Sequence, residues 1–277
     1  STFTGSGNSG YLDGDADDAE FSNHVTNMIT DSSGNIYIAD TENRAIRKID
    51  AQGNVSTYNN SGQDTELNGP RGMAFDSAGN MYVAENWSNR ISKIDPSGNV
   101  TRFANTNQNW GSDNGAVADA SFEGVKDLAF DSAGNLFVAT NHRIRKIEFS
   151  GDAASVSDFI GNGNWGDEDG QGEQVRFGDI QSIVFDSSDN LYFADLAHQK
   201  IKKVSTDGTS TTIAGNGEWD YVDGFGVNAR FRNPSFLAID SSDNLYVSDT
   251  DNNRIRKLEL QGDGQYKVST IAGTGQY

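Results

Sequence analysis

The sequence has no cysteine, only 3 histidines and no long apolar run. The absence of cysteine excludes disulfides, thiolate catalysis and cysteine-ligated zinc, but it identifies no cellular compartment. No stretch of 18 apolar residues occurs, so no membrane insertion is expected. Basic residues are also scarce, with 21 Lys and Arg against 40 Asp and Glu. The formal net charge of −19 argues against nucleic acid as a partner, because phosphate backbones require clusters of Lys and Arg.

Most of the basic residues lie in five similar short segments, such as the one that contains Arg44, Arg47 and Lys48. We interpret them as positive side chains that pair with neighbouring carboxylates on repeated strands. The chain is rich in Gly, Asn, Asp and Ser, which is typical of short strands joined by many turns, so helix is expected to be nearly absent. It begins at Ser1 without Met and without a signal-like apolar region, and we expect an extracellular, cell-surface or periplasmic protein.

The segment "DSSGNIYIADTENRAIRKID" of residues 31–50 recurs in four further versions, which begin at Asp76, Asp131, Asp186 and Asp240. The spacing is 45 residues once and otherwise 54 or 55, a period that indicates stacked supersecondary units. Each unit divides into four strands, which in the second unit are 72–76, 80–85, 90–95 and 99–104. We therefore predict an all-β fold, a β-propeller of four-stranded antiparallel blades, five by count, as a single domain over residues 1–277.

The residues of the first turn in each repeat are themselves sufficient to explain why the chain turns there. The Asp that opens it is able to accept hydrogen bonds from backbone amides through its side chain. The position three residues later is Gly in three repeats and Asp in two, and both tolerate a positive φ: Gly34, Gly79, Gly134, Asp189 and Asp243. We expect these turns to fix the hairpin register. Both faces of each blade are partly apolar, which is expected if each blade packs between two others.

Segments 244–259 ("NLYVSDTDNNRIRKLE") and 135–148 ("NLFVATNHRIRKIE") resemble NHL repeats, whose signature runs from an Asp-Gly-Asn turn to Asn-His-Arg-Ile. The resemblance covers essentially residues 21 to 277. It implies a β-propeller. It leaves the function open, because the family includes protein-binding, RNA-binding and lyase members.

The sequence indicates the number of blades less directly than it indicates the fold. Five sets of the first three strands stand beside six candidates for the fourth: 1–5, 55–59, 100–104, 156–160, 210–215 and 268–273. Residues 1 to 5 or residues 268 to 273 would complete blade five, which leaves one terminal strand spare. We expect a five-bladed propeller. The alternatives are part of a six-bladed ring and a spare strand that supports self-association by pairing with another protomer.

The long loops that precede the repeats, here called the leading loops, share a pattern in four of the five units (10–21, 110–122, 165–177 and 219–231). An aromatic residue comes before a position that holds Asp or Asn, which lies eight residues before a Phe. The aromatics are Tyr11, Trp110, Trp165 and Trp219, the next position holds Asp13, Asn114, Asp169 and Asp223, and the last holds Phe21, Phe122, Phe177 and Phe231. The second unit, preceded by 61–70, lacks the aromatic, so a more open sector is expected there.

Two interpretations of the leading loops remain open. In the structural one, the Phe enters the core between blades, the Asp makes a tight turn and the aromatic lies on the neighbouring blade. In the functional one, aromatic rings beside carboxylates bind a glycan or a protein partner. The candidate ligand-binding residues are Tyr11, Trp110, Trp165, Trp219, Asp13, Asp169 and Asp223.

Metal sites have weaker support. Calcium is conceivable at Asp13, Asp15, Asp17 and Asp18, or at Asp167, Glu168 and Asp169, but these do not fit the calcium-loop spacing, and no cofactor is expected. Another repeated position holds Asp40, Glu85, Thr140, Asp195 and Asp249, and we interpret it as an acceptor of hydrogen bonds from the following turn. The lyase branch of the NHL family uses three histidines on zinc, but the three here, His24, His142 and His198, occupy different repeat positions.

No nucleophile elbow of the Gly-x-Ser-x-Gly type is present. We therefore predict a non-enzymatic binding or scaffold propeller that recognises a protein or glycan through aromatic- and Asp-rich rim loops. One alternative is a metal-dependent lyase or lactonase-like hydrolase at the central channel. The other is a structural assembly subunit joined by the spare terminal strand.

Overall fold

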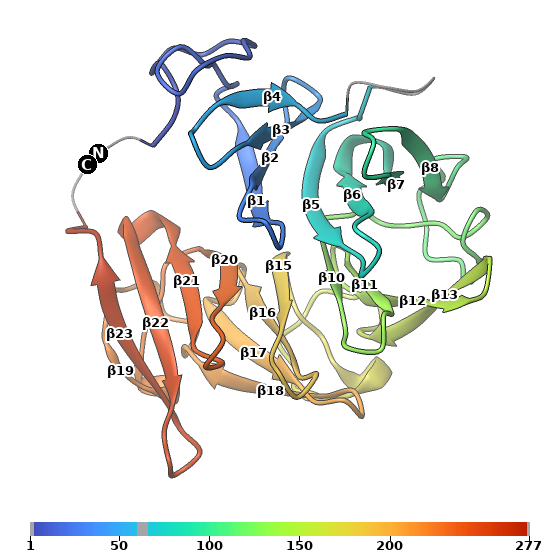
Figure 1. Cartoon of the computed structure of the whole chain (residues 1–277). Coiled ribbons are helices and arrows are strands. Elements are labelled where there is room, and N and C mark those ends of the chain that lie inside the picture. Colours follow the sequence, from blue (N-terminus) through green and yellow to red (C-terminus); the bar gives the residue numbers. More distant parts are fainter. Residues whose placement is uncertain (1–2, 60–65, 276–277) are drawn as a thin grey trace. The chain divides into compact units, whose positions relative to one another are not determined.

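The computed structural model describes residues 3–59 and 66–275, and the chain folds as an all-β, five-bladed β-propeller (Figure 1). Two compact units are present, one of Ser1–Phe130 with Glu148–Val156 and one of Asp131–Ile147 with Ser157–Tyr277. The expectation of a single domain stays a prediction. The only helical segments in the described residues are four short 3-10 turns: η1 (Asn86–Ser88), η2 (Gly172–Gln174), η3 (Gly226–Asn228) and η4 (Thr250–Asn252).

Each blade is a sheet whose first four strands follow one another along the chain. Blade one contains β1 (Val25–Thr30), β2 (Ile36–Asp40), β3 (Ala45–Ile49) and β4 (Val55–Thr57). Blade two contains β5 (Pro70–Phe75), β6 (Met81–Glu85), β7 (Arg90–Ile94) and β8 (Val100–Ala104). Blade three contains β10 (Asp127–Phe130), β11 (Leu136–Ala139), β12 (Ile144–Ser150) and β13 (Ala153–Ile160).

Blade four contains β15 (Ile180–Phe185), β16 (Leu191–Asp195), β17 (Lys200–Val204) and β18 (Thr209–Ala214). Blade five contains β20 (Pro234–Ile239), β21 (Leu245–Asp249), β22 (Arg254–Leu260) and β23 (Tyr266–Ala272). β23 is therefore the fourth strand of blade five, whereas residues 3–5 form no strand. The candidate strand at 1–5 was wrong for its described part, and the remainder lies outside the described residues.

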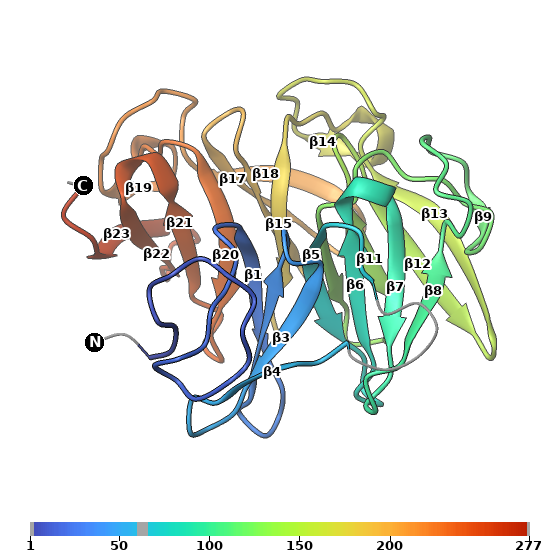
Figure 2. The same ribbon diagram turned by 90° about the horizontal axis from the view of Figure 1, so that it is seen from above.

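Three leading loops add a short fifth strand at the edge of their own blade. β9 (Gly115–Ala116) pairs with β13, β14 (Gly170–Gln171) with β18, and β19 (Gly224–Phe225) with β23 (Figure 2). In blade one, Gly14 forms an isolated bridge with Val55 of β4 in the same way. Each loop thereby covers an edge that would otherwise expose unpaired backbone groups.

The predicted turns are confirmed. Asp31 Oδ1 accepts the backbone N–H groups of Ser33 and Asn35, each at 2.9 Å. The third residue after the Asp has a positive φ in every repeat, between 59° at Asp189 and 83° at Gly134. Because the side chain of the first Asp holds the turn closed, each hairpin keeps its register: Ile36 pairs with Thr30 directly across the first turn.

Buried apolar side chains fill the space between neighbouring blades within each unit. Tyr37, Ile46 and Met73 belong to one such cluster of blades one and two, and Tyr192 and Leu258 belong to another of blades four and five. Each fully buried side chain of this kind contributes about 1.5–3 kcal/mol. Within each unit, the repeat thus recurs because one blade buries apolar side chains of its neighbour.

Candidate functional site

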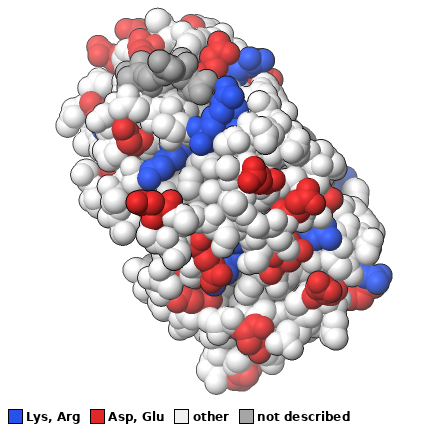
Figure 3. Space-filling view, turned by 90° about the vertical axis from the view of Figure 1, so that its right-hand side faces the viewer, with Lys and Arg blue, Asp and Glu red and all other residues white. Residues whose placement is uncertain are grey.

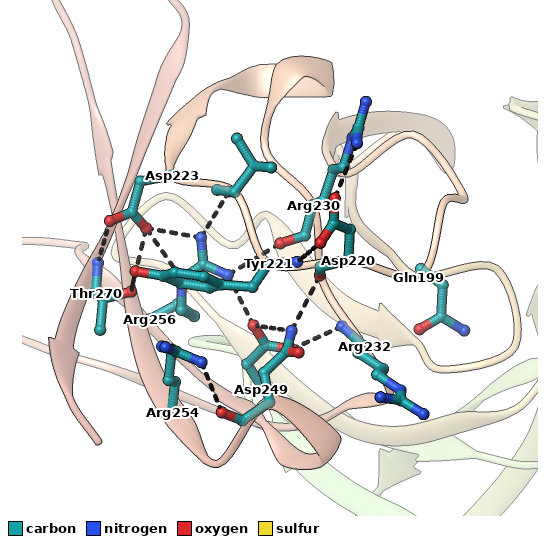
Figure 4. A network of polar contacts seen from close by, with 12 residues as sticks. Gln199, Asp220, Tyr221, Asp223, Arg230, Arg232, Asp249, Arg254, Arg256 and Thr270 are labelled. Atoms are coloured by element: carbon teal, nitrogen blue, oxygen red, sulfur yellow. Dashed lines mark hydrogen bonds and ion pairs between the residues drawn. The ribbon is translucent and has the colours of Figure 1, made fainter. Parts of the chain in front are cut away.

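The leading loop of blade five is held by a buried cation, Arg256 of β22 (Figure 4). Its Nη1 donates to Asp249 Oδ2 and its Nη2 to Asp223 Oδ1, both at 2.7 Å. The same two nitrogens donate to the backbone carbonyls of Arg230 and Val222 in the loop. The second oxygen of Asp223 accepts the N–H of Thr270 in β23 at 3.2 Å. Asp223 therefore joins the loop to two strands of the blade, and we call this arrangement the loop clamp.

Blades one and four repeat the loop clamp. In blade one, Asp13 accepts Arg47 Nη2 at 2.6 Å and the N–H of Thr57 at 2.9 Å. In blade four, Asp169 accepts Lys202 Nζ at 2.7 Å and the N–H of Thr212 at 2.8 Å. The cations are fully buried, whereas the carboxylates are partly exposed. The interpretation of the repeated basic residues as partners of carboxylates is confirmed at these positions.

Blades two and three depart from the loop clamp together with their sequences. Blade three has Asn114 at the loop position, and its buried Arg145 instead pairs with Asp158 of β13, with Nε 2.5 Å from Oδ1. Blade two has Ser92 at the position of the cation. There Arg90 donates to both oxygens of the buried Glu85, at 3.0 and 2.6 Å. Each buried charge thus keeps a partner of opposite sign, as burial requires.

The repeated carboxylates at the end of the second strand have structural partners, although not mainly those predicted. Asp40 and Asp249 accept the N–H of the residue that follows the loop Phe, at 3.0 Å from Ser22 and 2.7 Å from Arg232. The following turn contributes the side-chain amide of Asn43 or Asn252 rather than its backbone. Asp195 of blade four accepts the N–H of Gly178 and also that of His198 in the following turn.

Phe122, Phe177 and Phe231 are fully buried, as the structural interpretation of the leading loops predicts, and Phe21 is half-buried. The tryptophans are exposed instead. The exposed fractions are 64% for Trp110, 59% for Trp165 and 63% for Trp219. Trp110 and Trp219 each form a parallel bridge with the Phe of their own loop. Both features of the sequence pattern therefore hold, because the Phe anchors the loop and the indole remains in solvent.

Tyr11 does not share the position of the tryptophans, so the sequence alignment of the four aromatics was wrong at this residue. Ser9 forms the bridge with Phe21 that Trp110 and Trp219 form with their own Phe. The Tyr11 ring lies 5.0 Å from the Arg47 guanidinium, and its hydroxyl is 3.2 Å from Thr57 Oγ1. Tyr221 has the same contacts in blade five, with Arg256 at 4.9 Å and Thr270 Oγ1 at 2.9 Å. Tyr11 thus covers the buried cation.

Sequence reasoning missed Trp87, which is 50% exposed and belongs to η1 of blade two. It lies against Gly69, where an added Cβ would come within 2.5 Å of the indole. Arg44 lies 5.9 Å from the same ring. Blade two therefore also carries an exposed indole, but this indole comes from the turn after the second strand of the blade and not from a leading loop. A Trp in "ENWSNR", where other repeats have small or polar residues, was the available signal.

Trp165 differs from the other tryptophans because two imidazoles contact it. The ring centroid of His198 lies 5.1 Å from that of Trp165, and the centroid of His142 lies at 5.9 Å. His198 Nδ1 donates to Asp195 Oδ2 at 3.0 Å, and His142 Nδ1 donates to the carbonyl of Gly178 at 3.1 Å. The hydrogen bond to Asp195 raises the pKa of His198 above its ordinary value of 6.5.

Asp167, Asp195 and His198 form the one group within the described residues whose carboxylate and imidazole atoms would surround a metal ion, within 4.8 Å of one another. His24 and His142 are not part of it. Lys200 and Lys202 both bind Asp167, and although burial acts to raise the pKa of Asp167, these cations lower it. Asp13 and Asp169 are likewise bound by cations in the loop clamps. Calcium would have to displace these side chains.

The surface agrees with the acidic composition. On the face drawn in Figure 3, Lys and Arg side chains lie among Asp and Glu side chains. Residues 3–59 and 66–275 contain no helix with the length and apolar composition that crossing a membrane requires.

Residues 231–258 match the model of the NHL repeat. Protein SUPPRESSOR OF QUENCHING 1, chloroplastic, from Arabidopsis thaliana is 24% identical over 96% of this chain and 28% of its own length. NHL repeat-containing protein 2 from Homo sapiens is 35% identical over 32% of this chain and 12% of its own length. The chain thus spans less than a third of the length of these curated relatives.

Solved structures with the same fold include a Bacteroides thetaiotaomicron protein of unknown function, with a TM-score of 0.75 and 17% identity over 99% of this chain and 64% of that one. An auxiliary nutrient binding protein from the same organism has a TM-score of 0.58 and 17% identity, over 98% and 76% of the two chains. Virginiamycin B lyase from Staphylococcus aureus has a TM-score of 0.57 and 17% identity, over 91% and 71%. Residues 231–258 therefore carry an NHL repeat, and the chain with its five blades is similar to NHL-repeat β-propellers.

Proposed function

We propose that this propeller is a non-enzymatic binding module, which recognises a protein or glycan through the exposed indoles of its leading loops. The observation that carries the proposal is that all 4 tryptophans of the chain are at least half exposed. Tryptophan is usually among the more buried residues, and it is enriched at the energetic centres of binding interfaces. The loop clamps support the proposal because they hold the loops that carry Trp165 and Trp219 in a fixed geometry before any ligand binds.

The other candidate residues contribute less to this proposal. Asp13, Asp169 and Asp223 already use both carboxylate oxygens within the protein, so only their exposed lone pairs remain for a ligand. Tyr11 covers Arg47 with its ring. The tryptophans would therefore supply most of the binding energy. The nutrient-binding neighbour supports a binding role on this fold, and a location outside the cell remains part of the proposal.

The test is a triple variant, in which Trp110, Trp165 and Trp219 are replaced by Ala, probed on a glycan array and in a pull-down from the source organism. Because the three indoles are exposed, the variant should keep its melting temperature while it loses at least about tenfold in affinity for whatever the wild type binds. Leu260→Ala, an equally exposed apolar side chain on β22, is the matched control and should bind normally. Undiminished binding by the folded triple variant would refute the proposal.

The second candidate function is a metal-dependent lyase or lactonase-like hydrolase, which the group of Asp167, Asp195 and His198 and the lyase neighbour favour. We favour it less because Lys200 and Lys202 neutralise Asp167. Elemental analysis of the purified protein distinguishes the two functions. A bound metal at one equivalent, lost in Asp195→Asn, would support the enzyme.

The third candidate is an assembly subunit joined by a spare strand. The described residues offer no spare terminal strand for it. β23 pairs with β22 on one side and β19 on the other, and residues 3–5 form no strand.

A further inference from the structure

The first turns of neighbouring blades are joined in the second compact unit by a pair of hydrogen bonds. Asp189 of blade four accepts the N–H of Ser132 at 2.8 Å and its hydroxyl at 2.5 Å. Asp243 of blade five accepts the N–H and hydroxyl of Ser187 at 2.9 and 2.6 Å. In both cases a carboxylate from the positive-φ position of one turn binds the Ser that follows the first Asp of the preceding turn. We call this pair of bonds the turn staple.

Blades one and two lack a turn staple although the Ser is present. Ser32 corresponds to Ser132 and Ser187, but the position opposite it holds Gly79 instead of Asp. Ser32 and Gly79 line the same pocket, which has a volume of about 470 Å3. Within the described residues, the N–H and the hydroxyl of Ser32 have no hydrogen-bond partner. The pocket therefore contains two donors in the arrangement that binds a carboxylate elsewhere in this chain.

The rest of the pocket wall contains aromatic rings, one cation and two carboxylates, Asp31 and Asp76. Tyr37, Tyr58 and Phe75 line it, with Tyr37 in edge-on contact with the other two at 4.9 and 5.1 Å. Lys48 also lines the pocket and supplies a positive charge.

Asp76 is engaged by its own turn, because it accepts the N–H groups of Ala78 and Asn80 and the side-chain amide of Asn80. The carboxylate of Asp31 is also engaged by its own turn, since it accepts hydrogen bonds from Ser33, Asn35 and Tyr37. The equivalent Asp186, which precedes Ser187, is engaged by Asn190 and Tyr192 in the same way, and Ser187 nevertheless binds the carboxylate of Asp243.

We propose that this pocket between blades one and two binds a small organic carboxylate, whose anionic group takes the place that Asp189 and Asp243 occupy in the turn staples. The carboxylate accepts the N–H and hydroxyl of Ser32, and the apolar part of the ligand packs on Tyr37, Tyr58 and Phe75. The Gly at position 79 keeps the site open, because a Cβ there would be in ordinary contact with Pro96 and only a longer side chain would reach Ser32.

The probe is 3-phenylpropanoate, and 3-phenylpropanamide is the matched compound without the charge. Binding is followed through the backbone amide signal of Ser32 in 1H–15N spectra. Because hydrogen bonds to a charged acceptor are stronger than neutral ones, the acid should bind at least about tenfold more tightly than the amide and shift the Ser32 signal downfield. Equal binding of the two compounds, or no shift at Ser32, would overturn the proposal.

The decisive variant is Gly79→Asp, which builds the missing turn staple. Asp adopts a φ of 59° and 60° at positions 189 and 243, so position 79, with a φ of 82°, should accept it. The variant should lose binding of 3-phenylpropanoate. Gly34→Asp has the same φ of 82° in the turn of blade one, outside the pocket lining, and should bind like wild type. Unchanged binding by Gly79→Asp would overturn the proposal.

A second variant serves if Gly79→Asp does not fold. Ser32→Ala removes the hydroxyl but leaves the backbone N–H, and it should weaken binding of 3-phenylpropanoate about tenfold. Acetyl-Asp-methylamide tests the apolar wall, because it carries the carboxylate without an aromatic group, and it should bind more weakly than 3-phenylpropanoate. If acetyl-Asp-methylamide bound more tightly than 3-phenylpropanoate, the proposal of a small organic ligand would be wrong, and the pocket would instead bind acidic side chains of a protein partner.

Discussion

At the residue scale, the molecule depends on buried charges that have specific partners. Arg256 and Asp249 have fully buried side chains, and Asp223 extends the pair to the surface loop. Removal of one member leaves the other as an uncompensated charge in a medium of low polarity, which is far more costly than loss of a surface ion pair. The loops that carry the candidate binding residues are therefore tied to the stability of the blades.

Arg256→Met should lower the free energy of unfolding by about 3–5 kcal/mol, because Asp249 then remains buried without a cation. The measurement is urea denaturation. The double variant Arg256→Met, Asp249→Asn should recover part of the loss. Arg232→Met is the control, since its 3.8 Å pair with Asp251 is exposed, and its effect should stay below about 1 kcal/mol. Equal effects of the two single substitutions would contradict the role of burial.

Asp240, which opens the fifth repeat, makes the stability of the fold depend on pH in the acid range. The side-chain amide of Asn244 is the main cause that lowers the pKa of Asp240 to about 2, from an ordinary value of 3.8. The folded state therefore holds this proton less tightly than the unfolded state, so the stabilisation is complete above pH 3.8 and is lost as the pH falls towards about 2. Asn244→Ala should flatten the fall of stability between about pH 4 and 2. Parallel curves for variant and wild type would exclude this contribution.

Several residues show what sequence reasoning could reach at this scale. The turn role of Asp31 and the positive φ of Gly34 were predictable, because both act within a few residues of chain. The grouping of Tyr11 with the tryptophans was wrong because it ignored the spacing: Tyr11 lies two residues before Asp13, whereas each tryptophan lies four residues before its loop Asp or Asn. Trp87 was missed because it reaches Gly69 from a different part of the repeat.

At the scale of elements, the change from Gly to Asp in the last two repeats has a function that local tolerance does not explain. Asp189 and Asp243 do adopt the positive φ that the turn requires. Their carboxylates also join each turn to that of the preceding blade, through Ser132 and Ser187. The same substitution therefore serves both the hairpin and the packing of one sheet on the next.

The turn staple between blades three and four should be measurable by a double-mutant cycle. Asp189→Gly and Ser132→Ala should each destabilise the protein by about 1 kcal/mol, because each removes a charge-assisted hydrogen bond that is partly exposed. Together they should cost less than the sum, since both interrupt one interaction. Thermal unfolding followed by circular dichroism gives the three values. Strict additivity would show that the two residues do not interact.

At the scale of the whole molecule, neighbouring blades within each compact unit pack on each other through buried side chains, as blades one and two and blades four and five do. Such repeats gain stability from the interfaces between adjacent units as well as from each unit alone. The predicted single domain follows from this principle, and it has a direct test in the cooperativity of unfolding.

The chain should unfold in one transition, with coincident midpoints from tryptophan fluorescence and from circular dichroism. Arg256→Met, although it lies in blade five, should then lower both midpoints equally. Trp87 and Trp110 belong to one compact unit and Trp165 and Trp219 to the other, so single-tryptophan variants report on each separately. Two separated transitions would show that the units unfold as independent domains.

The sequence by itself determined the four-stranded repeat, the turns and the all-β fold, because strand alternation and turn chemistry act over a few residues and recur five times. Only the tertiary structure decided which strand completes blade five, how the loop clamps bind Arg47, Lys202 and Arg256, and where an absent turn staple leaves a pocket beside Ser32. These features join residues far apart in the chain, and such pairing depends on how the sheets pack rather than on the residues next to each position.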